Sequence, residues 1–217
     1  MADDKQAGLF SFTAAVPMYH PNLFEARAFG AKGKESGTPK FSANFAFQPD
    51  AADLASMKAI AVKIARAKWP DRALKDLQFP FSNGDKIAAS AKAKGKDGSF
   101  NAGKVIIAAR SKYEPGLAGV ENGKVVDYEG AARVAAKGKF YFGVEVLAQV
   151  NFVAYDGVGK NPDGVTAYLN KVLTTGKGVK VAGGASAAEV FKGYVGTTTT
   201  EDPTGGVGSA LDDEIPF

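Results

Sequence analysis

Apolar and polar residues alternate along residues 139–155, and this long period-two pattern constrains the fold more than any other feature. The side chains of one face are predicted to form the core: Phe140, Phe142, Val144, Val146, Ala148, Val150 and Phe152. A usual strand has about five or six residues, so this segment either bends strongly, with Gly143 as the bend, or turns midway. Long, coiled strands are what small closed barrels require.

Shorter patterns of the same kind predict strands over residues 9–16, 23–29, 41–47 and 165–173. Residues 31–40 are rich in Gly, Lys, Ser and Thr and are predicted to form a basic loop, and residues 113–133 a long excursion. A helix is predicted to begin after Asp50 as N-cap, with Asp53 at its third position, and to end at Trp69 before Pro70. Its apolar stripe is Leu54, Met57, Ile60, Ala61 and Ile64.

Two further segments, residues 86–94 and 104–112, also alternate with period two and are predicted to pair as a β-hairpin. One side of this hairpin would carry Lys86, Lys92, Lys94, Lys104, Arg110 and Lys112. Surfaces built for solubility intersperse charges of both signs, whereas this face has no matching acids. The hairpin face therefore indicates a polyanionic partner.

Charge is also distributed unevenly along the whole chain. Residues 201–217 hold five of the 23 acidic residues and none of the 27 basic residues, so the preceding residues carry 18 acids and a formal charge of +9. A basic body with an acidic tail favours a polyanion such as a nucleic acid, and the tail either competes for the same surface or binds a different partner.

Several classes of function are disfavoured by the residues that the chain lacks. There is no Cys and a single His, His20, so thiolate zinc sites, disulfides and a Cys nucleophile are excluded. No phosphate-binding loop, GxSxG elbow or HExxH motif is present, and three adjacent acids at 212–214 rarely form a metal site. We expect no enzyme activity, cofactor or metal. No segment has the roughly 18 consecutive apolar residues of a membrane span, and we expect a reduced, cytoplasmic setting.

Aromatic side chains accompany the predicted cationic face. Tyr141 and Tyr155 lie on the non-core side of the long alternating segment, Phe100 in the predicted hairpin turn, and Tyr113 directly after Lys112. Single-strand binding without sequence preference combines a cationic groove for the phosphates with aromatic rings that stack on bases. We therefore expect these four rings and the hairpin cations to contact nucleic acid.

These elements together predict a mainly β protein, an OB-fold-like antiparallel barrel with one inserted helix and long loops. A β-sandwich is the alternative. Residues 1–196 would form the binding domain, with a short helical piece near residues 187–191. Residues 197–217, beginning with a run rich in Gly, Thr and Ser, would form a flexible linker and acidic tail.

The chain ends in Asp212-Asp213-Glu214-Ile215-Pro216-Phe217. An apolar Ile-Pro-Phe after an acidic run is not explained by solubility, and a partner pocket can bury the Phe217 ring while cations hold its carboxylate. This ending resembles the acidic C-terminal tip of bacterial single-stranded DNA-binding proteins. That resemblance implies recruitment of DNA replication, repair and recombination proteins.

The body is similar instead to bacteriophage single-stranded DNA-binding proteins with an OB-fold core. The resemblance covers residues 110–191 and rests on the order of short motifs: Ser-Lys-Tyr-Glu-Pro at 111–115, Tyr-Glu-Gly at 128–130, Asn-Phe-Val-Ala-Tyr-Asp at 151–156, Leu-Asn-Lys-Val at 169–172 and Ser-Ala-Ala-Glu-Val-Phe at 186–191. It implies a protein that coats single-stranded DNA in the host bacterial cytoplasm. It does not indicate which residues contact DNA.

Two other functions remain open from the sequence. An RNA-binding OB-fold module of cold-shock type would have similar charge and aromatic content, because contacts to 2′-hydroxyls cannot be recognised in a sequence. A phage structural or adaptor protein could use the tail alone, although the basic face would then have no role.

Overall fold

The computed structural model describes residues 7–29, 36–158 and 162–181. The predicted helical piece at 187–191 and the predicted tail at 197–217 lie outside the described residues, so the boundary at residue 196 stays a prediction. Residues 36–40 are strand, and the loop predicted there is wrong for these five positions.

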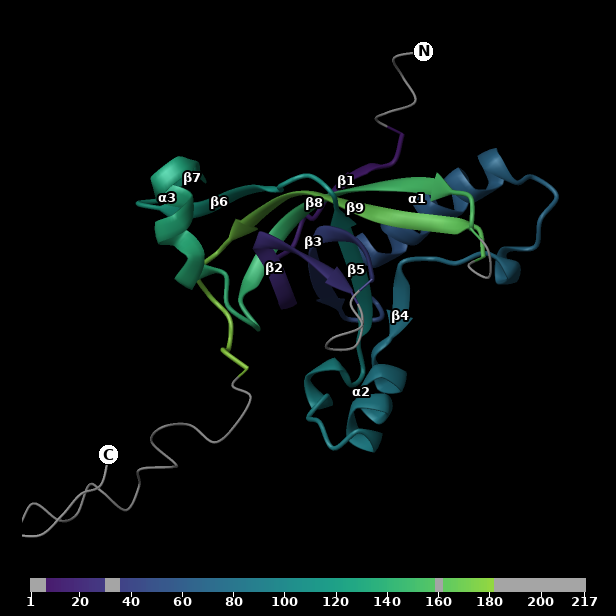
Figure 1. Cartoon of the computed structure of the whole chain (residues 1–217), viewed down its shortest axis with the longest axis horizontal. Coiled ribbons are helices and arrows are strands. Elements are labelled where there is room, and N and C mark those ends of the chain that lie inside the picture. Colours follow the sequence, from purple (N-terminus) through teal and green to yellow (C-terminus); the bar gives the residue numbers. More distant parts are fainter. Residues whose placement is uncertain (1–6, 30–35, 159–161, 182–217) are drawn as a thin grey trace, which may run out of the picture. The chain divides into compact units, whose positions relative to one another are not determined.

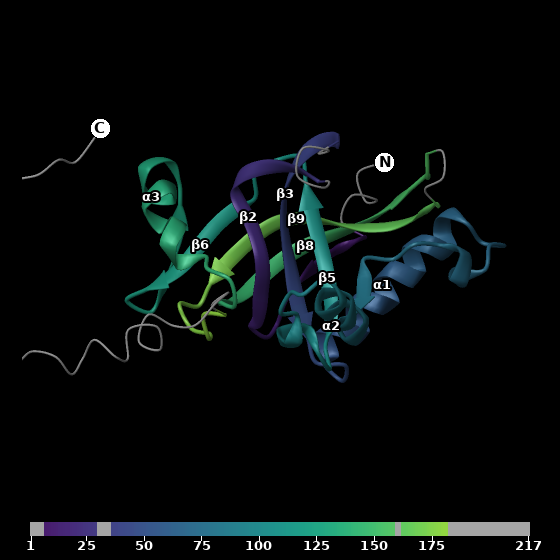
Figure 2. The ribbon, with the colours of Figure 1, turned by 60° about the horizontal axis from the view of Figure 1, so that its bottom comes forward.

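Five strands close into a barrel (Figures 1 and 2). They are β2 (Val16–Phe29), β3 (Ser36–Phe47), β5 (Val105–Ser111), β8 (Glu145–Tyr155) and β9 (Gly164–Thr174). Their order is β8-β2-β3-β5-β9, and β9 returns to pair with β8. Within this barrel only β5 and β9 are parallel. This is the five-stranded Greek-key barrel of the OB-fold, so the predicted fold is confirmed and the sandwich is not formed.

Four short strands extend the barrel sheet. They are β1 (Leu9–Ser11) beside β8, β4 (Phe81–Asn83) beside β5, and the antiparallel pair β6 (Gly116–Glu121) and β7 (Lys124–Tyr128), of which β6 continues the sheet from β9. Asn122 and Gly123 join β6 to β7 with φ of 50° and 74°. Asn-Gly favours such a two-residue hairpin turn, so the prediction of an excursion at 113–133 is wrong for this hairpin.

Helices join or flank the strands. They are α1 (Ala52–Lys68), α2 (Gly84–Ala93) and α3 (Gly130–Ala135), with 3-10 turns η1 (Leu74–Asp76), η2 (Ser99–Asn101) and η3 (Ala136–Lys139). In Figure 1, α1 lies beside β8 and β9, whereas α2 lies beyond the end of β4 and β5. None of the helices that the structure describes is long and apolar enough to cross a membrane.

The predicted core of the long alternating segment is largely confirmed. Six of its seven apolar residues are buried in the main core, namely Phe140, Val144, Val146, Ala148, Val150 and Phe152. Phe142 is the exception, because it packs with Tyr19 in a second, smaller cluster. Gly143 has φ of +96°, so the predicted bend lies there, and the regular strand begins at Glu145.

The predicted stripe of α1 also faces the core. Leu54, Met57 and Ala61 are buried, and the two isoleucines of the stripe are partly buried against the same cluster. The prediction of Asp50 as N-cap is wrong, because the helix begins at Ala52 without a side-chain cap. Asp53 instead accepts hydrogen bonds from the Thr13 backbone N–H at 2.7 Å and from its hydroxyl at 2.6 Å. This carboxylate ties α1 to the chain between β1 and β2.

The strand predicted at 86–94 is wrong, because residues 86–93 belong to α2 and Lys94 is its C-cap. The Asn83 side chain accepts a hydrogen bond from the Lys86 N–H and caps the helix. Lysine and alanine make up most of the segment, and both favour a helix over a strand. The predicted hairpin therefore does not exist, and β5 pairs with β3, β4 and β9 instead.

Candidate nucleic-acid interface

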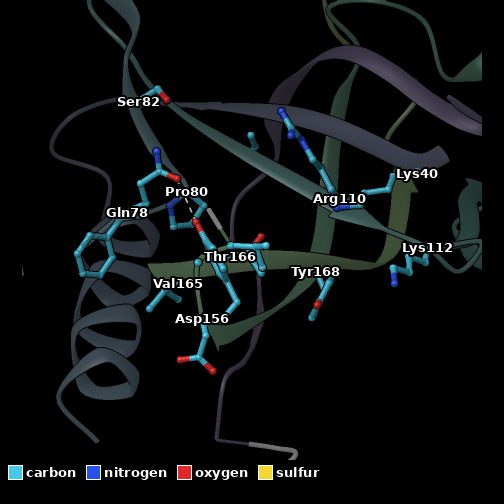
Figure 3. A pocket seen from close by; sticks show the side chains of 15 residues that line it. Lys40, Gln78, Pro80, Ser82, Arg110, Lys112, Asp156, Val165, Thr166 and Tyr168 are labelled. Atoms are coloured by element: carbon cyan, nitrogen blue, oxygen red, sulfur yellow. Dashed lines mark hydrogen bonds between the residues drawn. The ribbon is translucent and has the colours of Figure 1, made fainter. Parts of the chain in front are cut away.

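An open groove of about 910 Å³ runs over the outer surface where β5 meets β9 (Figure 3). We call it the β5 groove. It is lined by Lys40, Gln78, Phe79, Pro80, Ser82, Ala108, Arg110, Lys112, Tyr155, Asp156, Gly157, Val158, Val165, Thr166 and Tyr168. These residues come from β3, β5, β9, the end of β8, the segment before and within β4, and the connection from β8 to β9.

Strand register explains which side chains face this groove. Ala109 of β5 is paired with Ala167 of β9, and both are buried in the barrel. Because side chains alternate along a strand, Arg110 and Tyr168 next to them point outward. Phe41 of β3 is paired with Ser111, so Lys40 and Lys112, one position further on, are also neighbours across the strands.

The groove is positively charged where β3 and the C-terminal end of β5 line it. Lys40, Arg110 and Lys112 line it, and neither lysine forms an ion pair with any residue that the structure describes. The two carboxylates beside the groove are each paired with a cation. Asp156 pairs with Lys68 at 2.7 Å, and Asp163 pairs with Arg72.

The β8–β9 connection is held in place by these ion pairs and by backbone contacts. The Gly157 N–H donates to Asp163 at 2.6 Å, and this bond, followed by the Arg72 contacts, lowers the pKa of Asp163. The Tyr155 hydroxyl donates to the Gln78 side-chain oxygen at 3.0 Å. Burial, and then the negative charge of Asp163, raises the pKa of Tyr155, so its hydroxyl ionises less readily than that of a solvent-exposed tyrosine.

Three of the predicted contact residues, Arg110, Lys112 and Tyr155, meet in the β5 groove. Lys86, Lys92 and Lys94 do not line it, because they belong to α2 and its C-cap. Tyr113 is 83% exposed and lies outside the groove, although it directly follows Lys112.

Phe100, Lys104 and Tyr141 are placed elsewhere on the barrel. The Lys104 ammonium donates to the Tyr19 hydroxyl at 2.8 Å and to the Phe100 carbonyl at 3.0 Å, and the Phe100 ring packs on Phe142. This aromatic cluster attaches η2 to the barrel. The Tyr141 hydroxyl donates to the carbonyls of residues 177 and 178.

Sequence reasoning missed Lys40, Gln78 and Tyr168 as groove residues. Lys40 was assigned to a loop, and Gln78 lies in an irregular segment with no pattern. Tyr168 could have been found, because it lies on the outward face of the predicted strand at 165–173. Among the described residues, no cluster of His, Asp or Glu side chains is arranged to hold a metal ion.

Comparison with known proteins agrees with this fold. The single-stranded DNA-binding protein of bacteriophage Enc34, in a C-terminally truncated form, is similar in structure with a TM-score of 0.59 and 18% identity, over 81% of this chain and 89% of that one. The same phage protein in complex with single-stranded DNA also gives 0.59 and 18%, over 82% and 91%. No curated protein sequence matches this chain.

A sequence-family model matches more of the chain than the short motifs do. The model described as Enterobacter phage Enc34, ssDNA-binding protein, matches residues 12–204. It includes nearly all of the first half of the chain, where the motifs gave no specific resemblance. The chain therefore belongs to the family of phage single-stranded DNA-binding proteins represented by that of Enterobacter phage Enc34.

Proposed function

We propose that this chain binds single-stranded DNA in the β5 groove, as a binding protein and not as an enzyme. The observation that carries the proposal is the groove itself, in a chain of this family. It lies over the second and third barrel strands, β3 and β5, and beside the connection between the fourth and fifth, β8 and β9. OB-folds bind oligonucleotides at this place. Three cations line it, and the neighbouring carboxylates are paired with other cations.

A fluorescence titration tests this function. Single-stranded DNA, duplex DNA and RNA of equal length and equivalent sequence are titrated at two salt concentrations. We expect much tighter binding of single-stranded DNA than of duplex, little sequence preference, and a footprint on the order of 4–16 nucleotides. Equal affinity for duplex would refute the proposal. Tighter binding of RNA would support the cold-shock alternative instead.

The α2 lysines remain candidates for additional phosphate contacts. Lys86, Lys92 and Lys94 are exposed, and within the described part of the chain none of them forms an ion pair. The groove reaches Ser82 of β4, and α2 begins two residues later. A strand longer than the groove would pass this helix. Replacing all three lysines with Ala should weaken long oligonucleotides more than short ones.

We further propose that the C-terminal residues Asp212, Asp213, Glu214, Ile215, Pro216 and Phe217 recruit proteins of replication and recombination in the host cytoplasm. The support is the sequence of the tip and its resemblance to that of the bacterial proteins. The five acids of residues 201–217 would also compete with DNA for a body of formal charge +9. Both roles can be separated by two deletions.

Deleting residues 201–217 should tighten DNA binding, most at low salt, where screening of the acids is weakest. Deleting Phe217 alone keeps all five acids, so DNA affinity should not change. That deletion should abolish capture of partners from bacterial lysate. Wild-type protein should capture more partner when single-stranded DNA is added, because DNA in the groove releases the tail. Identical recovered proteins with and without Phe217 would refute recruitment by the tip.

A further inference from the structure

We propose that the β5 groove is divided along its length, with a phosphate end, a base end and the Tyr168 ring as a stacking platform between them. The proposal rests on binding of single-stranded DNA in this groove and says how the strand lies there. Phosphates would contact Lys40, Arg110 and Lys112, and bases would enter the opposite end beside Pro80 and Thr166.

The phosphate end is defined by where the cations gather. Lys40, Arg110 and Lys112 lie together at the C-terminal end of β5, as Figure 3 shows. The strand register makes them neighbours, with Ser42 paired to Arg110 and Phe41 to Ser111. At this end of the groove, no described residue that lines it is acidic. Phosphates are therefore favoured here over any uncharged part of DNA.

The base end has the opposite character. Gln78, Pro80, Ser82 and Thr166 line it, and none of these four side chains is charged. Its carboxylate, Asp156, is paired with Lys68, so neither charge is available to attract a phosphate without breaking that pair. Figure 3 shows Pro80, Val165 and Asp156 on the side of the groove away from Lys40. A surface without an unpaired cation offers phosphates no countercharge, so bases are favoured over phosphates at this end.

Tyr168 is the ring best placed to stack on a base. Its side chain is 42% exposed and lines the groove. It forms no hydrogen bond and no ring contact with any residue that the structure describes. Tyr155, in contrast, is held by its hydrogen bond to Gln78. Every base has a flat face, so a free ring on a fixed strand provides sequence-independent stacking.

Tyr168 lies where the two ends meet. The pairing of Ala109 with Ala167 places Tyr168 on β9 beside Arg110 on β5. A nucleotide with its phosphate at the cations can therefore place its base over this ring. The arrangement predicts that the cations bind the phosphate and the Tyr168 ring binds the base of the same nucleotide.

An oligonucleotide without bases separates these contributions. Wild-type protein and three variants are titrated at low salt with a normal single strand and with an abasic strand of equal length. The variants are Tyr168→Ala, Tyr168→Phe, and Lys40→Ala combined with Lys112→Ala. Thermal unfolding of each variant confirms that it is folded.

Tyr168→Ala should weaken binding of the normal strand by about 5- to 150-fold, since one stacked base contributes about 1–3 kcal/mol. It should leave binding of the abasic strand unchanged, and Tyr168→Phe should behave as wild type because the ring remains. The double lysine variant should weaken both strands by the same factor, because both keep their phosphates.

Three outcomes would overturn the proposal. The first is an equal loss of both strands with Tyr168→Ala, and the second is a loss of the normal strand alone with the double lysine variant. The third is a failure of wild-type protein to bind the abasic strand at low salt, because the cations would then not hold phosphates by themselves. If wild-type protein binds neither strand, the proposed function itself fails.

Discussion

Removing the three cations of the β5 groove should reduce the salt dependence of DNA binding by a calculable amount. The change is the triple substitution of Lys40, Arg110 and Lys112 by Ala, all of which line the groove. Each phosphate contact with a single strand contributes about −0.7 to the slope of log affinity against log salt. Three contacts predict a slope shallower by about 2 in the variant.

This difference in slope is large enough to measure. Raising salt fourfold, from about 50 to 200 mM, should weaken the wild-type protein about 20-fold more than the variant. The assay is fluorescence anisotropy with a labelled single strand at five or more salt concentrations. Slopes are compared, so a change in overall affinity does not obscure the result.

A control variant has the same change in net charge. Lys63 on α1, Lys124 on β7 and Lys137 on η3 are exposed and do not line the groove. Their triple substitution by Ala should leave the slope close to that of the wild type. Equal changes of slope in both triple variants would refute the reasoning, because net charge and not the groove would then govern binding.

Three further predictions concern stability. Asp53→Ala should lower the free energy of unfolding, measured by urea denaturation, by roughly 3 kcal/mol, because the two donors of Thr13 lose a buried charged acceptor. Asp53→Asn should lower it less, because the amide oxygen can still accept a hydrogen bond. Gly143→Ala should lower the midpoint of thermal unfolding, because Gly143 has φ of +96° and the added Cβ would meet the carbonyl of residue 179. An unchanged midpoint would contradict the bend assigned to this residue. Folding raises the pKa of Tyr155, so the free energy of unfolding should fall as pH rises above about 10. Tyr155→Phe should remove part of that decrease when the free energy of unfolding is measured from about pH 8 to 11.

Periodicity alone was sufficient to predict the elements with one buried face. The alternation at 139–155 predicted the core side of β8, and Gly143 predicted its bend. The apolar stripe predicted α1, and the alternation at 165–173 predicted β9. Each of these patterns is local, since burial of one face imposes a period of two on a strand and of 3.6 on a helix.

The same rule failed where the pattern was ambiguous. In α2, alanines and lysines alternate by chance, and alanine is small enough for either face of a strand or a helix. The capping Asn83 carried the information that the periodicity did not. In the hairpin of β6 and β7, the Asn122-Gly123 turn was a local signal, but burial alternates only in the first half of β6, and β7 is exposed up to Tyr128.

The candidate site is determined almost entirely by tertiary structure. The chain itself determined that a basic, aromatic-containing barrel would carry an acidic tail, and the family resemblance came from short motifs in order. Only the closed barrel brings Lys40, Lys112 and Tyr168 to one groove, through the pairing of β3 with β5 and the parallel pairing of β5 with β9. Pairing between strands far apart in sequence depends on which faces can be buried together in three dimensions, and a periodicity within one segment does not contain that information.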